Sequence, residues 1–347
     1  RQRHLPFLFL LGGGLFASGS ATALPFFFST GNPDGRMATV SRPDSPGKME
    51  TESADDFVLG STTSITSASF TGLITNAGTA TIGEVRVEIY RVFPADSNIA
   101  RTPAVPTRVN SPSDVEFTDR DTATGNLNFS VTTLSASFTA NNSVQNGINK
   151  IPNQRTGGEG SVTGQEARFD ITFTTPILLP ADHYFFVPQV QVDGGEFYWL
   201  SAPRPIVPPG TPFPPATADL QSWIRNQSLD PDWLRVGTDI IGGTPAPTFN
   251  AVFSLDGTTV PEPSTLALLG GGFVLLHGSG NADSSIGWDG AWRIPGQSRC
   301  RIPRGAGIPI RFQPSVLETS DPASPGVHGL RKRFPTGKWR TGCLSPD

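Results

Sequence analysis

Cysteine is missing from the first 299 residues of this 347-residue chain, and its two cysteines, Cys300 and Cys343, both lie near the C-terminal end. A disulfide framework therefore cannot stabilise the body of the protein. The same absence excludes zinc and iron–sulfur sites built on cysteine clusters from that region. The body has to be held together by non-covalent packing and hydrogen bonds.

Charged residues and histidine are also scarce. Charged side chains make up 16% of the chain, against about 25% in ordinary soluble domains. Residues 24–276 are net acidic, which argues against a nucleic-acid partner, because phosphates require a basic face. His183 is the only histidine in that range, so a Ser-His-Asp triad would have to use it, and no Gly-x-Ser-x-Gly elbow occurs. We expect His183 to be structural or exposed, and we expect neither catalytic residues nor an organic cofactor.

The N-terminus has the three parts of a secretory signal peptide. A basic end at Arg1–His4 precedes an apolar run from Leu5 to Phe16 and the small-residue site Ala21-Thr22-Ala23. We expect cleavage after Ala23. The sequence therefore predicts an exported protein.

Glycine, proline and β-branched residues dominate the body of the protein, and the whole chain holds 38 glycines and 33 prolines. In residues 83–93, Val85, Val87 and Ile89 alternate with polar positions, which predicts a strand with one buried and one wet face. Similar short runs predict further strands at 55–59, 64–74, 127–134, 168–174, 184–192, 197–200 and 249–255. Short strands without βα alternation favour an all-β antiparallel sandwich with a jelly-roll-like arrangement.

The expected domain organisation follows from these patterns. We expect an irregular N-terminal arm over 24–53 and a β-sandwich domain over 54–257. Residues 219–225 predict the one short helix, with Asp219 as its N-cap. Both termini of the chain are expected to be disordered.

A short stretch after the sandwich carries the most specific signal. It reads Val260-Pro261-Glu262-Pro263-Ser264 and continues as an uncharged run to Leu276. Each proline fixes φ near −65° and lacks an N–H group, and the preceding residue is pushed toward extended backbone. The motif is therefore expected to be an exposed, strand-like peptide that a protease could read.

This stretch resembles the PEP-CTERM sorting signal of bacterial exported proteins. In that family a Pro-Glu-Pro tripeptide precedes a membrane-spanning helix and a terminal arginine cluster. Residues 174–186 and 195–201 are also similar to a strand–turn–strand pair in β-sandwich domains of these proteins. The resemblance implies an exosortase-type sorting enzyme as partner, transient membrane contact through 264–276, and a cell-surface or extracellular location in a Gram-negative-type bacterium.

The chain departs from the family after Leu276. The apolar run from Ser264 to Leu276 has 13 residues, which gives a helix of about 20 Å, short of the roughly 30 Å hydrocarbon core of a bilayer. Residues 277–347 are rich in glycine, proline and arginine and show no strand or helix period. This segment is either the product of a shifted reading frame or a disordered basic tail. We expect the truncated signal to be recognisable but not processed.

Four acidic residues lie within eight positions: Asp114, Glu116, Asp119 and Asp121. Calcium takes six to eight oxygen ligands and suits flexible loops, although the spacing does not match an EF-hand loop. The pattern is a weak calcium candidate, and a solvated acidic loop is the favoured alternative.

Aromatic residues gather around a proline-rich loop, and they are Tyr198, Trp199, Trp223 and Trp233. They could form a surface for extracellular polysaccharide, but aromatics also supply much of the buried area of protein cores. We favour core packing and expect Trp223 and Trp233 to be the two most exposed. Glu196 beside these aromatics, with a neighbouring aspartate, is the candidate pair for glycoside hydrolysis.

Two functions remain open. The favoured one is an exported surface or matrix β-sandwich protein with a structural or binding role. The alternative is a secreted protein that binds or acts on polysaccharide.

Overall fold

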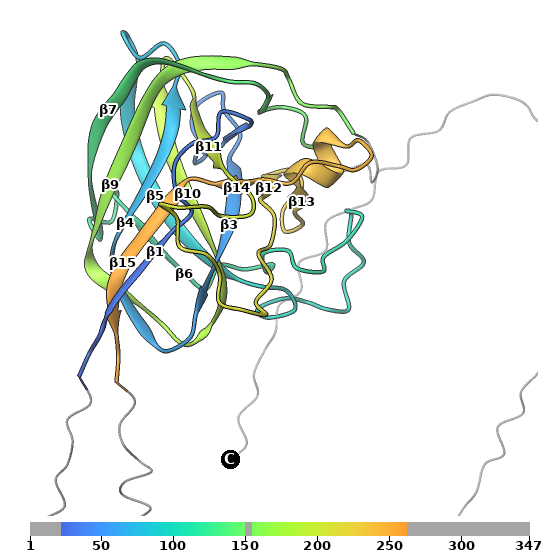
Figure 1. Cartoon of the computed structure of the whole chain (residues 1–347). Helices are drawn as coiled ribbons and strands as arrows, with labels where there is room; N and C mark the ends of the chain where they lie inside the picture. Colours follow the sequence, from blue (N-terminus) through green and yellow to red (C-terminus); the bar gives the residue numbers. More distant parts are fainter. Residues whose placement is uncertain (1–21, 150–154, 262–347) are drawn as a thin grey trace, which may run out of the picture. The chain divides into compact units, whose positions relative to one another are not determined.

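The computed structural model describes residues 22–149 and 155–261, and regular structure in this part of the chain is almost entirely β-strand (Figure 1). The described elements in chain order are β1 (Pro25–Ser29), β2 (Ala38–Val40), β3 (Thr51–Leu59), β4 (Thr63–Ile74), β5 (Thr81–Arg91), β6 (Thr118–Asp121), β7 (Leu127–Ala140), β8 (Ser143–Val144), β9 (Val162–Leu179), β10 (Asp182–Asp193), β11 (Phe197–Ala202), β12 (Trp223–Asn226), β13 (Leu234–Arg235), the π-helix η1 (Val236–Ile241), β14 (Asn250–Ala251) and β15 (Phe253–Thr259).

The strands form two sheets. The six-stranded sheet has the order β13-β12-β3-β10-β5-β6. The nine-stranded sheet has the main path β1-β15-β4-β11-β2-β8, while β9 pairs with β4 and β7, and β14 pairs with β11. Every pairing between these strands is antiparallel except that of β2 with β8. The expected all-β fold with two antiparallel-rich sheets is therefore confirmed, and all eight predicted strands overlap observed ones.

The main core lies between the two sheets and is rich in phenylalanine. Alternate residues of each strand point to the same side, and the inward ones of both sheets form one apolar cluster. Phe186 of β10 and Phe253 of β15 stack across the sandwich with ring centroids 5.0 Å apart, and Phe70 stacks on Phe169 at the same distance. Complete burial of each such ring contributes roughly 1.5–3 kcal/mol.

A second, smaller apolar cluster covers the outer face of the six-stranded sheet. Its members come from β3, β5, β10 and β12 and from the loops around β12, and they are Ala54, Tyr90, Phe185, Val187, Leu220, Trp223 and Trp233. Val85, Val87 and Ile89 are buried as predicted, but the opposite face of β5 is only partly wet: Glu84 and Arg86 remain partly exposed, whereas Glu88 and Tyr90 are buried. The loops that cover this face come from distant parts of the chain, so the local pattern did not show them.

The predicted helix at 219–225 is wrong. Residues 219–222 are a loop, and Trp223–Asn226 is strand β12, which pairs with Thr51–Ala54 of β3. Asp219 does not cap a helix, because its carboxylate accepts a hydrogen bond from Arg204 Nε at 3.1 Å. Pairing with β3 outweighs the weak local preference for helix.

The segment 24–53 is not the irregular arm that its turn residues predicted. It contributes β1, which pairs along its whole length with β15, and β2, which pairs with β11. Both strands are short and their partners lie far away in sequence, so no local alternation of apolar and polar residues predicted them.

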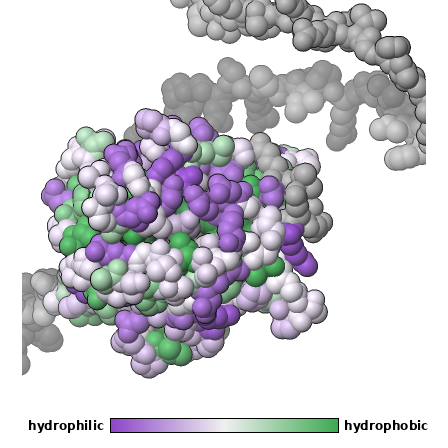
Figure 2. Space-filling model, turned by 90° about the horizontal axis from the view of Figure 1, so that it is seen from above, coloured by the Kyte–Doolittle hydropathy of each residue, from purple (hydrophilic) through white to green (hydrophobic). Residues whose placement is uncertain are grey.

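Three segments lie outside the described residues: the leader through residue 21, the sorting segment from Glu262 and the tail 277–347. The prediction that the termini are disordered concerns these segments. No helix within the described ranges is long and apolar enough to cross a bilayer. Seen from above, hydrophilic side chains gather across the middle of the surface, with hydrophobic residues in separate groups between them (Figure 2).

Candidate functional site

The two ends of the sandwich domain lie side by side. β1 and β15 pair from Pro25 opposite Thr258 to Ser29 opposite Ser254, so their free ends leave the sheet together (Figure 1). Thr259 N donates to Leu24 O at 2.8 Å, and Leu24 N donates to Thr259 Oγ1 at 3.0 Å. The position after the expected signal-peptide cleavage thus lies next to the start of the expected sorting motif.

Two residues of the sorting motif fall within the described chain. Val260 N donates to Thr62 O at 2.8 Å, which fixes the backbone up to the motif, while the Val260 side chain is exposed. Pro261 follows as the last described residue, and Glu262, Pro263 and Ser264 lie outside the described range. The motif therefore begins directly at the end of an ordered strand.

The aromatic residues considered as a ligand surface are buried. Tyr198 is 5% exposed, and Trp199, Trp223 and Trp233 are each 1% exposed. Trp199 Nε1 donates to Val252 O at 2.7 Å, and Trp233 Nε1 donates to Ser113 O at 3.3 Å. The expectation that Trp223 and Trp233 would be the most exposed is wrong, because the loops around β12 fold these rings onto the six-stranded sheet.

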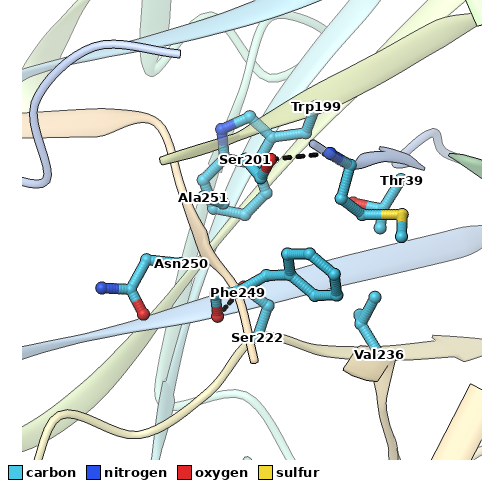
Figure 3. A pocket seen from close by; sticks show the side chains of 9 residues that line it. Thr39, Trp199, Ser201, Ser222, Val236, Phe249, Asn250 and Ala251 are labelled. Carbon is cyan, nitrogen blue, oxygen red and sulfur yellow. Dashed lines mark hydrogen bonds between the residues drawn. The ribbon is translucent and has the colours of Figure 1, made fainter. Parts of the chain in front are cut away.

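A small cavity lies beside Trp199 between β11, β14 and the loop before β12. It is lined by Thr39, Ser201, Ser222, Asn250 and apolar neighbours that include Phe249 (Figure 3). Ser201 Oγ accepts a hydrogen bond from Met37 N at 2.9 Å, and Ser222 Oγ donates to Phe249 O at 3.0 Å. Its volume of about 10 Å³ is close to that of a single water probe, which is too small for an organic ligand.

The four acidic residues of the calcium candidate do not form a site. Asp114 is paired with Arg101 at 3.0 Å and with Arg108, and its pKa is lowered, because hydrogen bonds from these arginines and from Asn98 N outweigh its burial. Asp121 Oδ1 accepts a hydrogen bond from Thr124 N at 2.6 Å, and Glu116 and Asp119 are exposed. No group of three or more potential metal ligands lies together within residues 22–149 and 155–261. The arginines hold Asp114 and a turn amide holds Asp121, while Glu116 and Asp119 stay in solvent, so the four carboxylates do not converge.

A polar pocket of about 220 Å³ opens at one end of the six-stranded sheet's outer face. We call it the acidic pocket, and its charged and amide side chains are Glu50, Glu52, Asp114, Glu116, Asp230, Arg225 and Gln227. Burial raises the pKa of Glu50, and the nearby Glu52 carboxylate raises it further, against the opposing effect of Arg86. The pocket thus presents mainly carboxyl groups, with one guanidinium group among them.

A buried polar network lies beneath the acidic pocket. Arg225 donates to both carboxylate oxygens of Glu52 and, at 2.8 Å, to Tyr90 Oη, while Trp233 lies under its guanidinium group. Tyr90 Oη lies 3.0 Å from Glu52 Oε1 and 2.9 Å from Glu88 Oε2. Burial, followed by the charge of Glu52, raises the pKa of Glu88 well above its ordinary value. Since a phenol donates only one proton, Tyr90 can donate to only one of these two carboxyl groups at a time, and Glu88 Oε1 also lies 3.5 Å from Arg86 Nη1.

Two consecutive aspartates join the strands to the proline-rich loop. Asp55 and Asp56 point to opposite faces of β3. Asp55 accepts a hydrogen bond from Ala251 N at 2.7 Å, and its Oδ1 lies 3.1 Å from Ser222 Oγ. Asp56 Oδ2 accepts one from Leu220 N at 3.1 Å and lies 2.6 Å from His183 Nε2.

Burial of the Asp56–His183 contact disfavours the charged form of both groups. Burial lowers the pKa of His183 to about 4, against the opposing charges of Asp182 and Asp219. Burial also raises the pKa of Asp56 well above its ordinary value. Ser222 contacts Asp55 and not His183, so these residues are not arranged as a Ser-His-Asp relay.

Glu196 is not placed as a glycosidase carboxyl group. Its two carboxylate oxygens form ion pairs with Arg42 Nη1 at 3.0 Å and Lys48 Nζ at 3.1 Å. These contacts tie the end of β11 to the loop before β3. Lys48 also donates to Val192 O at 2.8 Å, so this cluster closes one end of the sandwich.

The acidic pocket and the buried network were missed from sequence. Glu52, Glu88 and Arg225 belong to three strands that lie far apart along the chain, and each one alone resembles an ordinary wet-face residue. The pair Asp55-Asp56 next to the apolar Phe57-Val58-Leu59 was a usable signal, since charged residues are rarely fully buried without partners. Compared with known proteins, the chain matches no family model, no curated sequence and no solved structure.

Proposed function

We propose that this chain is an exported β-sandwich protein that carries a PEP-CTERM-like sorting signal and serves a structural or binding role. Its place is the cell surface or extracellular matrix of a Gram-negative-type bacterium, and its partner during sorting is an exosortase-type enzyme. Membrane contact is transient and runs through residues 264–276.

The pairing of β1 with β15 is the observation that supports this proposal most directly. Leu24 and Val260 leave the sandwich at the same place. In a domain with this arrangement, the leader and the segment bound by a sorting enzyme both extend from the same end of the sandwich. Export and sorting can therefore follow each other without separating the strands of a sheet. Strand β15 ends at Thr259, so the Pro-Glu-Pro motif at 261–263 follows almost directly after it in the sequence.

Processing by a sorting enzyme tests the proposal. Three versions of the chain are secreted from a host that contains an exosortase, beside a known substrate of that enzyme. In the first version the chain is unaltered, and in the second residues 277–347 are replaced by a completed apolar helix with terminal arginines. The third version adds Pro261→Ala and Pro263→Ala to the second.

Intact-mass spectrometry then distinguishes the outcomes. We expect cleavage near Glu262 in the second version only, because its helix spans the bilayer and its motif is complete. If the second version stays uncut while the known substrate is processed, the sorting proposal fails. Cleavage of the unaltered chain would instead show that residues 277–347 are tolerated.

The alternative function, binding of extracellular polysaccharide, is supported by the acidic pocket. Small-molecule sites use a few convergent polar groups in a concave surface, and Arg225, Gln227 and the carboxyl groups of the pocket converge there. A glycan array probed with the secreted chain and with Gln227→Ala tests this candidate. Signal that is lost in the variant supports it, and an array without signal rejects it.

A further inference from the structure

Strand β7 is a long edge of the nine-stranded sheet, and its pairing with β9 is regular from Leu127 to Thr133, ahead of register shifts between Thr133 and Phe138. It pairs with β9 from Leu127 to Ala140, and no other described strand pairs with it. These residues include no charge and no proline. Proteins normally blunt such edges with lysine, proline or very short strands, because a free edge is a template for another strand.

The other strands at the ends of the described sheets are blunted. β6 has four residues, of which Asp119, Arg120 and Asp121 are charged, and β8 and β13 have two residues each. β1 has five residues and begins with Pro25. β7 is thus distinguished from the other edges by its combination of length and neutrality.

The ladder with β9 determines which backbone groups of β7 are free. Thr174 N donates to Asn126 O at 3.0 Å, one step before the pair Leu127–Phe173. Because hydrogen-bonded pairs alternate along an antiparallel ladder, residues 128, 130 and 132 bond to β9. Phe129, Val131 and Thr133 therefore direct their N–H and C=O groups away from the sheet.

The same edge exposes apolar side chains. Val131 lies opposite Phe169 of β9, on the side of the sheet that faces the core, yet it is 36% exposed at the open rim of the sandwich. Leu134, close by, is 47% exposed. A strand added to β7 would bond to the free backbone groups and would cover this rim.

We propose that β7 is the interface of a homodimer, in which the β7 strands of two copies pair antiparallel about a two-fold axis at Val131. In this register Val131 lies opposite Val131 of the second copy, and Phe129 lies opposite Thr133, so outward-directed residues meet outward-directed residues. A second copy suits this edge because a neutral strand can pair with itself without placing like charges opposite each other. Two-fold dimers with such self-complementary surfaces are the commonest soluble oligomers. The inference is independent of where the protein is sent.

The mass of the full chain in solution tests the proposal. Light scattering and sedimentation under reducing conditions, which keep Cys300 and Cys343 from cross-linking, are expected to give twice the mass of one chain. Val131→Lys places two charges opposite each other at the axis, so we expect half the wild-type mass. Val109→Lys, at a loop residue that is 66% exposed, is the matched control and is expected to keep the wild-type mass.

Amide hydrogen exchange of the wild-type chain gives a second measurement, which decides the matter if Val131→Lys does not fold. When the protein concentration is raised about a hundredfold, the amides of Phe129, Val131 and Thr133 are expected to exchange more slowly, since only the dimer protects them. The amides of Asn128, Ser130 and Thr132 are already bonded to β9 and serve as the reference.

Several results would overturn the proposal. These are a wild-type mass of one chain at every concentration, a dimer that survives Val131→Lys, a dimer that Val109→Lys also breaks, or exchange at residues 129, 131 and 133 that does not depend on concentration. A single-chain mass would leave the β7 edge to a strand from another protein.

Discussion

The two sheets share one core, but the charged residues on their outer faces differ in exposure to water. Where β4, β9 and β15 form it, the outer face of the nine-stranded sheet carries small polar residues and exposed charges, among them Ser67, Ser69, Arg168, Asp170 and Asp256. Its other part, around Leu73, Tyr198 and Leu200, is apolar and buried. The outer face of the six-stranded sheet buries Glu52, Glu88, Tyr90 and Arg225 beneath loops. Both faces carry charged residues, but those on the six-stranded sheet are buried whereas Arg168 and Asp256 on the nine-stranded sheet remain in water.

This difference changes what each charge contributes. Arg168 and Asp170 form an ion pair at 3.0 Å while both side chains remain about half exposed, so water screens their attraction. Arg225 and Glu52 are nearly inaccessible, and Arg225 is the cation that pairs with Glu52, while Arg225 also pairs with Asp230 at 2.8 Å. A buried pair of this kind adds little net stability but is strongly destabilising when one partner is removed.

Removing one partner on each face is expected to give the largest contrast. Arg225→Ala leaves the Glu52 carboxylate buried without its counter-charge, so we expect the free energy of unfolding to fall by about 3–5 kcal/mol. Arg168→Ala on the other sheet is the matched control, and we expect a loss below about 1 kcal/mol. Denaturant unfolding of both variants at neutral pH measures the two losses.

The double variant Arg225→Met with Glu52→Met sharpens the test. Because it removes both charges, we expect it to be more stable than Arg225→Ala. Equal losses in Arg225→Ala and Arg168→Ala would contradict the distinction between the two faces.

Acid sensitivity is expected to come partly from the covered face, through His183. Its pKa is about 4 in the folded protein and about 6.5 when unfolded, so the unfolded state binds a proton more readily. The stability from neutral His183 is therefore present above pH 6.5 and is lost as the pH falls toward 4. Its full size is about 2–3 kcal/mol after allowance for partial exposure.

The variant His183→Gln removes this contribution and should flatten the dependence of stability on pH. Denaturant unfolding at intervals between pH 4 and pH 7 compares it with the wild type. Two curves that run parallel through this window would show that His183 does not titrate as described. Asp55 and Asp56 have raised pKa values, so the stability that their protonated forms contribute is lost as the pH rises. This change is opposite in sign to that of His183, so the two effects can be told apart.

The smallest effect is expected from calcium. Asp114 is already paired with arginines and Asp121 with a turn amide, so neither carboxylate is free for an ion. We expect chelator followed by added calcium to shift the melting temperature by less than about 1 °C, since an ion that does not bind the native state cannot stabilise it. A rise of several degrees on adding calcium would restore the metal site at Asp114–Asp121.

The strands that the sequence predicted correctly share a clear local cause. In β9 the residues Phe169, Ile171 and Phe173 alternate with polar residues, and in β10 a continuous apolar run marks a strand buried on both faces. β12 gave the opposite outcome, because its strand state depends on pairing with β3, about 170 residues earlier in the chain. The candidate site shows the same division: the sequence singled out His183 as the one histidine of the body, whereas its contact with Asp56 and the acidic pocket depend on distant segments.

The sequence by itself determined that the body is disulfide-free and all-β, and it placed a signal-peptide-like leader and a Pro-Glu-Pro stretch at the ends of that body. These are properties of composition and short-range order, which any segment carries with it. Tertiary structure alone decided that Trp223 and Trp233 are core residues, that Asp114 is held by arginines, and that Glu52, Glu88 and Arg225 form one network. The reason is physical: burial and the pairing of charges depend on which distant segments pack over a residue, and a local sequence pattern does not indicate which segments these are.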